Sequence, residues 1–79
     1  MTREELLEAV AEILRDIFDN EELPVTEETS SADVEDWDSL EHINLMVEVE
    51  YAFGIKFNMG EINKMKNVGE LVDIIQKRV

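Results

Sequence analysis

The sequence predicts an all-α fold, a small bundle of three main helices and one short helix in a chain of 79 residues. Apolar side chains recur at helical spacing in three stretches, which predicts three amphipathic helices. A residue suited to capping stands before each stretch: Thr2, Asp38 and Asn67. Because so short a chain builds only one small core, we expect residues 1–79 to form a single domain.

The first predicted helix is TREELLEAVAEILRDIFDN, residues 2–20. Thr2 and Glu5 fit a capping box. One face of the helix carries Leu6, Leu7, Val10, Ile13, Leu14, Ile17 and Phe18. Pro24 prevents the helix from continuing, and a long polar connection, residues 20–37, follows. We expect its few apolar residues to hold it against the bundle, namely Leu23, Val25, Val34 and Trp37.

The second predicted helix begins at Asp38 or Ser39 and ends at Phe53, before Gly54. Asp38 and Glu41 are spaced as in a capping box. Two apolar stripes lie almost opposite each other on this helix: Leu45, Met46, Val49 and Phe53 on one side, and Leu40, Ile43, Val47 and Tyr51 on the other. If the first stripe is core, the second is either buried as well or left for a partner.

The remaining chain predicts a turn or extended link at residues 55–59 and a short helix at residues 60–65. A last helix follows, capped by Asn67 and Glu70. Its apolar face is Val68, Leu71, Val72 and Ile75, and Lys77 and Arg78 suit its negative C-terminal end.

The net charge of −13 is distributed unevenly. Residues 1–50 hold 17 acidic and two basic side chains, and residues 51–79 hold three acidic and five basic ones. Such a field disfavours nucleic acid and phospholipid head groups and favours basic protein surfaces. With no secretion signal, membrane-length apolar run or cysteine, we expect a cytoplasmic monomer without membrane insertion.

The stretch DVEDWDSLEHINLM, residues 33–46, places Ser39 between acidic residues and an apolar helix. Ser39 could cap that helix, but if Asp38 does so, the hydroxyl is free at the positive end of the helix dipole. That end tolerates a phosphate ester. A nucleophilic pair with His42 lacks an orienting acid and an oxyanion hole, so we predict no catalytic residue and no enzyme activity. The acidic residues lack the glycine of a calcium loop, so we predict no metal site.

On these residues the chain resembles an acyl carrier protein over essentially its whole length. The resemblance is carried by D-S-L at residues 38–40, E-x-x-F at residues 50–53 and G-I-K-F at residues 54–57. It implies that Ser39, flanked by Asp38 and Leu40, carries covalent 4′-phosphopantetheine. In this family a magnesium-dependent phosphopantetheinyl transferase takes the group from coenzyme A. The thiol of the group holds acyl groups as thioesters for delivery to partner enzymes.

The resemblance also implies a docking surface for acyl-loading and acyl-transfer enzymes with basic surfaces: Leu40, Glu41, Ile43, Val47, Glu48 and Glu50. Members of the fatty-acid type fold the acyl chain between their helices, and by analogy Met46 and Met65 would line such a pocket, since methionine adapts to variable contents. The alternative is that both methionines are ordinary core residues.

Departures from the fatty-acid type indicate a specialised carrier. Asp36 and Trp37 replace the usual pair of glycine and a small residue, and Asn44 and Tyr51 replace usual acids. We expect a secondary pathway of lipid, polysaccharide or polyketide-like acyl transfer, and a peptidyl or D-alanyl carrier stays open. The alternative from another class is a non-covalent acidic adaptor, or a DNA mimic, that occupies a basic partner surface.

Overall fold

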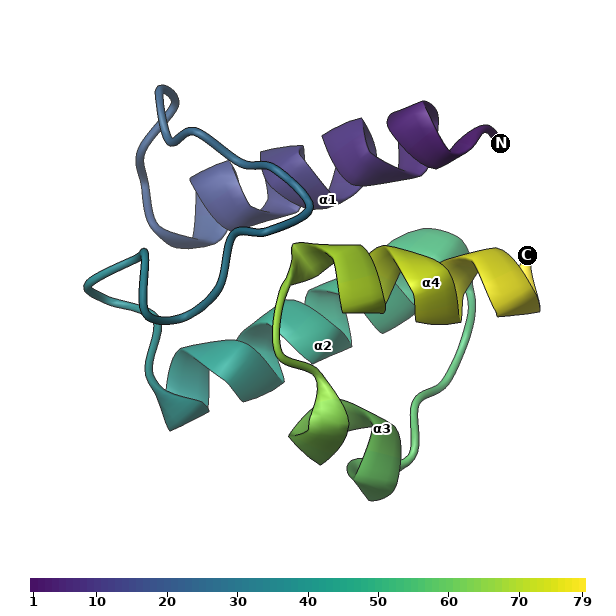
Figure 1. The fold of residues 1–79 in the computed structure, drawn as a ribbon. Helices are drawn as coiled ribbons and strands as arrows, with labels where there is room; N and C mark the ends of the chain where they lie inside the picture. The colour runs from purple at the N-terminus through teal and green to yellow at the C-terminus, as the bar shows by residue number, and fades with distance from the viewer.

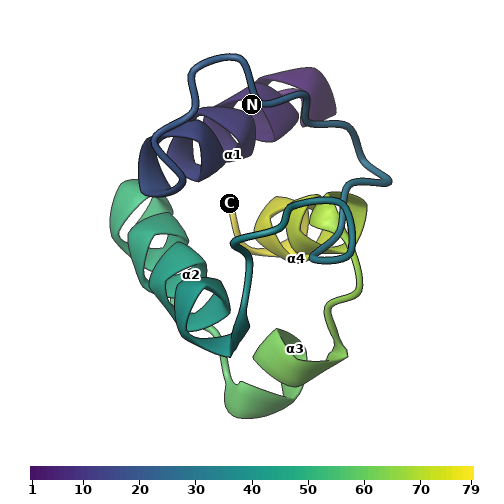
Figure 2. The same cartoon turned by 90° about the vertical axis from the view of Figure 1, so that its left-hand side faces the viewer.

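The computed structural model describes all 79 residues, with four helices: α1 (Arg3–Ile17), α2 (Ser39–Phe53), α3 (Met59–Lys64) and α4 (Val68–Arg78). α1 packs against both α2 and α4, and α3 lies at the open side between α2 and α4 (Figures 1 and 2). α1 runs opposite to α2 and α4, so both termini lie at the end of the molecule away from the start of α2 (Figure 1). The predicted all-α bundle is confirmed. None of the four helices is long and apolar enough to cross a membrane.

One buried cluster holds the three long helices together. It takes Leu6, Val10 and Leu14 from α1, Leu45, Met46 and Val49 from α2, and Val68, Leu71, Val72 and Ile75 from α4. Each set comes from a predicted apolar face. Burying one such side chain contributes about 1.5–3 kcal/mol to the free energy of folding. The connection between α1 and α2 is fixed to the same cluster by Leu23, Val34 and Trp37, as expected. The core of this small domain therefore extends into its longest loop.

The ends of α1 follow local chemistry. Thr2 and Glu5 form the predicted capping box, with Glu5 N–H on Thr2 Oγ1 at 3.1 Å. The helix ends at Ile17, so its predicted extension to residue 20 is wrong. Asp19 adopts a left-handed φ of 51°, and Asn20 N–H donates to the Arg15 carbonyl at 2.9 Å. This Schellman closure ends the helix without the glycine that usually marks one.

Two further predictions about helix starts need correction. Asp38 caps α2 by accepting Glu41 N–H at 2.9 Å, but the reciprocal half of the capping box is missing because the Glu41 carboxylate accepts the Asn44 amide at 2.7 Å. α3 begins at Met59, one residue earlier than predicted. The reason is that Asn58 makes a complete capping box with Glu61. The caps of α2 and α4, Asp38 and Asn67, are as predicted.

An ion-pair network around Arg3 ties the long connection to the two ends of the chain. The guanidinium donates to both carboxylate oxygens of Glu27, at 2.7 and 3.0 Å, and to Asp73 at 2.7 Å. Next to it, Gly69 N–H donates to the Glu27 carbonyl at 2.8 Å. A Cβ at Gly69 would lie 3.0 Å from that oxygen. The hydrogen bonds that Arg3 donates to Glu27 lower the pKa of the Glu27 carboxyl group. The same bonds, followed by the bond to Asp73, raise the pKa of Arg3.

We expect Arg3→Met to lower the melting temperature at neutral pH and to weaken its dependence on acid. The pKa of Glu27 in the fold lies below its ordinary value of 4.5. The pair therefore stabilises the fold above that pH, and this contribution is lost as the pH falls further. Thermal unfolding followed by circular dichroism from about pH 7 to about pH 3 measures both effects.

Lys66→Met is the matched control because it removes one exposed positive charge that makes no ion pair. Equal losses in the two variants would mean that overall charge, rather than this network, sets the stability.

Candidate site at the start of helix α2

Ser39 is the first residue of α2, and its side chain is exposed. The capping role belongs to its neighbour: Asp38 Oδ1 accepts Glu41 N–H, and the Asp38 carbonyl accepts His42 N–H at 2.9 Å. The serine hydroxyl is therefore not needed to satisfy the first turn. It stands at the positive end of the dipole of a 15-residue helix, where a negative ester group is stabilised.

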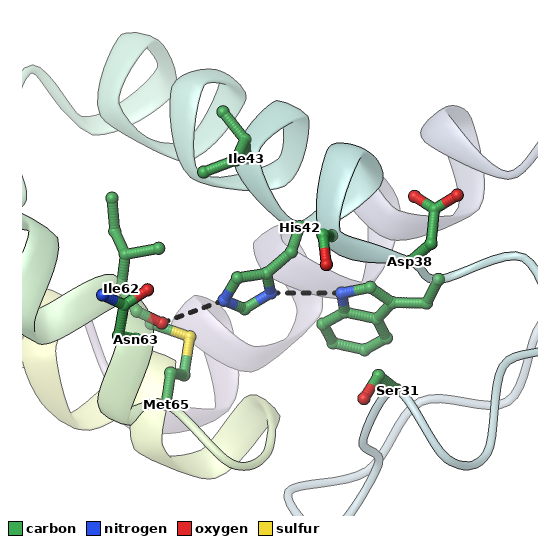
Figure 3. Close-up of a pocket in the computed structure, with 9 residues that line it drawn as sticks. Ser31, Asp38, His42, Ile43, Ile62, Asn63 and Met65 are labelled. Atoms are coloured by element: carbon green, nitrogen blue, oxygen red, sulfur yellow. Dashed lines mark hydrogen bonds between the residues drawn. The ribbon is translucent and has the colours of Figure 1, made fainter.

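Two hydrogen bonds through His42, here called the relay, join the residue before the cap of α2 to helix α3 beneath Ser39. The Trp37 indole N–H donates to His42 Nδ1 at 3.1 Å, and His42 Nε2 lies 3.0 Å from the Ile62 carbonyl (Figure 3). Because Nδ1 accepts the hydrogen bond from the indole, the tautomer that satisfies both contacts carries its hydrogen on Nε2, and this N–H donates a hydrogen bond to the Ile62 carbonyl. The two rings also stack, with centroids 6.0 Å apart. Both nitrogens of His42 are therefore engaged, and neither is free to act as a base on Ser39.

A depression of about 430 Å³ lies beside Ser39. It is lined by Trp37, Asp38, Ser39, His42 and Ile43 from the start of α2, and by Ser31, Ile62, Asn63 and Met65 from the loop and the α3 region (Figure 3). Ser31 and Asn63 were absent from the sequence-based site. No local pattern could have found them, because the fold brings their segments to Ser39 from a distance in the chain.

The two apolar stripes of α2 differ sharply in burial. Leu45, Met46 and Val49 are at most 1% exposed. On the opposite stripe Leu40 is 68% exposed, Ile43 40%, Val47 54% and Tyr51 89%. The neighbouring helices therefore cover only one side of α2 and leave a continuous apolar strip on the other.

The acidic residues predicted beside this strip lie in different settings. Glu48 is exposed, and Glu41 is half-buried with its carboxylate on the Asn44 amide. Glu50 turns back toward the chain and accepts Phe57 N–H at 2.7 Å, which fixes the link between α2 and α3. Glu50 thus has a structural contact that its position on the helical wheel did not indicate.

The two methionines predicted to line an acyl pocket differ in burial. Met46 is 1% exposed within the core cluster, whereas Met65 is half-buried and lines the depression beside Ser39. Their assignment to one acyl pocket stays a prediction.

A small helical bundle with an exposed serine at the start of its second helix, whose hydroxyl is not used to cap that helix, has the architecture of a carrier domain. The family profile described as "Phosphopantetheine attachment site" matches residues 4–75. An acyl carrier protein of Petrotoga mobilis is 35% identical over 79 residues, which is 100% of this chain and 93% of that protein. The meromycolate extension acyl carrier protein of Mycobacterium leprae is 32% identical over 77 residues, which is 98% of this chain and 67% of that protein.

Comparison with solved structures also points to an acyl carrier protein. The solution structure of a holo acyl carrier protein from Geobacter metallireducens superposes with a TM-score of 0.85 and 46% identity, covering 91% of this chain and 83% of that one. The chain belongs to the acyl carrier protein family. It is a carrier and not an enzyme, and its covalent cofactor is 4′-phosphopantetheine. Such carriers work with a phosphopantetheinyl transferase and acyl-handling enzymes. The acidic adaptor and the DNA mimic find no support in these matches.

The residues at the start of α2 fit this cofactor. Its phosphate ester needs an accessible hydroxyl, and Ser39 offers one at the N-terminal end of the α2 dipole, which favours an anion despite the neighbouring acidic residues. The polar arm of the cofactor needs hydrogen-bonding partners, and the adjoining depression offers Ser31 and Asn63.

We expect Asp38→Ala to destabilise the fold by about 1 kcal/mol, the usual cost of a lost N-cap. Ser39→Ala is expected to change the free energy of unfolding very little, because its hydroxyl does not cap α2. Equilibrium unfolding in urea at constant salt measures both values.

Asp38→Asn is the control, since it keeps the capping oxygen and removes the charge. A loss from Ser39→Ala as large as that from Asp38→Ala would show that Ser39 shares the cap.

Proposed function

We propose that Ser39 is the residue that carries 4′-phosphopantetheine, with Asp38 and Leu40 on either side. We further propose that residues 1–79 act as one monomeric carrier domain of a specialised acyl-transfer pathway in the cytoplasm. The observation that supports this most is an exposed hydroxyl at the first turn of α2 that the cap leaves free. The match to the phosphopantetheine attachment family spans that position.

Loading of Ser39 transfers the phosphopantetheinyl group from the pyrophosphate of coenzyme A to the serine oxygen, which forms a phosphodiester. The serine oxygen bonds to the phosphorus of the phosphopantetheinyl half of coenzyme A, the pyrophosphate bond breaks, and adenosine 3′,5′-bisphosphate leaves. The serine proton passes to a base. Because both nitrogens of His42 are already bonded, that base and the magnesium ion belong to the transferase. Once bound, the group supplies a thiol, which a chain without cysteine lacks.

Three residues of the exposed strip of α2 form the proposed docking surface, namely Leu40, Ile43 and Val47, with Glu41, Glu48 and Glu50 as its acidic border. An apolar strip in a segment as acidic as residues 1–50 suits an enzyme surface with an apolar groove and a basic rim. Glu41 and Glu50 each accept a hydrogen bond from within the chain, whereas Glu48 is exposed, which supports Glu48 as the acidic residue most accessible to a basic partner.

Several features favour a specialised pathway over general fatty-acid synthesis. Asn44 and Tyr51 are both exposed and neutral at positions where fatty-acid carriers usually present acids. Trp37 occupies the place of a small residue directly before the cap of α2. The relatives include carriers named for meromycolate extension beside others named only as acyl carrier proteins. The class of pathway we propose is acyl transfer for a lipid, polysaccharide or polyketide-like product.

Incubation with coenzyme A, magnesium and a broad-specificity phosphopantetheinyl transferase should add one phosphopantetheinyl group to the chain, as read by intact mass. Ser39→Ala should gain nothing. Ser30→Ala, the matched control, should load normally because Ser30 lies outside the depression. Loading of Ser39→Ala, or no loading of the parent by a transferase active on a known carrier, would refute the assignment.

A fatty-acid ketosynthase should bind the loaded chain several-fold more weakly than it binds a fatty-acid carrier. An exposed ion pair contributes about 0.2–1 kcal/mol, and two are missing at Asn44 and Tyr51. The double variant Asn44→Asp/Tyr51→Glu should recover affinity in a binding titration, and Asn20→Asp/Ala32→Glu, which adds the same charge outside α2, should recover less. Tight binding of the parent would remove the case for specialisation.

A further inference from the structure

The depression beside Ser39 has a polar rim and a closed base. Ser31, Asp38 and Asn63 line it with hydroxyl, carboxylate and amide groups. Trp37 and Ile62 line it as well, yet each is only 8% exposed and belongs to the core cluster. These two side chains, together with the half-buried Met65, lie between the surface beside Ser39 and the apolar interior.

The relay through His42 locks this base in place. It joins the end of the long connection to α2 and α3 through two hydrogen bonds, at 3.1 and 3.0 Å. The ring of Phe18, after the end of α1, packs against Trp37 at a centroid distance of 6.2 Å. A chain entering the core here would have to displace the indole and leave its buried N–H without an acceptor. An unpaired buried donor is costly, so the closed arrangement is strongly favoured.

The side chains of the interior behind this base do not reach the depression. Leu45 and Met46 are 1% exposed, and neither lines the depression. The lining of the depression is mixed, with Ile43 and Met65 beside the polar side chains, and these polar groups favour a cargo that donates and accepts hydrogen bonds over a bare hydrocarbon.

We propose that Trp37 and His42 are specificity-determining residues that close the bundle to its cargo. The acyl group then stays at the surface beside polar side chains, and the cargo class is a short acyl group that bears hydroxyl, oxo or amino groups. This inference rests on the proposed attachment at Ser39 and deepens it, because it names the class of acyl group that the carrier suits.

The test loads the parent chain with acetyl-, 3-hydroxybutyryl- or octanoyl-phosphopantetheine from the matching coenzyme A esters, and mass confirms each product. Two readouts follow: the melting temperature and the indole N–H resonance of Trp37, the one tryptophan of the chain. We expect octanoyl loading to change the melting temperature and the indole resonance no more than acetyl loading changes them. A higher melting temperature and a shifted indole resonance with octanoyl would overturn the inference and leave the attachment intact.

Two variants test the residues named. Trp37→Ala removes the base, so octanoyl loading should now raise the melting temperature above that of the acetyl form. His42→Leu keeps the indole and breaks both hydrogen bonds. Octanoyl loading of this variant should also raise the melting temperature above that of its acetyl form, but by less than in Trp37→Ala. If neither variant responds to octanoyl, Trp37 and His42 do not set the cargo. Absence of any mass gain on the parent would instead refute the proposed function itself.

Discussion

The presentation of Ser39 depends on the fixing of the chain immediately before it. Trp37 is buried and bonded to His42, and Asp38 bonds the first turn of α2, so two successive residues are anchored on the side of the bundle. The next residue, Ser39, is the first residue of α2 and is exposed to solvent. A serine that had to cap its own helix could not offer its oxygen to an enzyme with the same freedom. The cap on Asp38 therefore separates helix initiation from the chemistry of the hydroxyl.

The second consequence of this architecture is that α2 is a core helix and a surface helix at once. Only α1 and α4 are long enough to cover it, and they bury the stripe of Leu45, Met46 and Val49. The stripe that begins at Leu40 stays exposed. An apolar strip on a neutral protein invites self-association, whereas a net charge of −13 opposes contact between two copies and favours a basic partner.

Local chemistry made most of the fold predictable, and long-range contacts account for what was missed. Helix starts at Thr2 and Asn67 follow from residues three or four apart, as does the apolar side of each helix. The bond from Arg3 to Asp73 joins residues 70 positions apart, and that from His42 to Ile62 joins residues 20 apart. No periodicity encodes such pairs. Asp19 was missed for another reason: a left-handed residue other than glycine carries a weak signal.

The closed base beneath Ser39 links stability to the choice of cargo. With 17 of 79 residues buried, the bundle has little core to spare, and an indole is among the largest apolar groups that a core can hold. A smaller residue at position 37 would open space next to Ser39 and at the same time remove packing against Phe18 and a bonded N–H. An interior that admits long chains would thus cost this domain part of its core. Leaving the cargo at the surface keeps that core whole, and it is consistent with the polar side chains of Ser31, Asp38 and Asn63 in the depression beside Ser39.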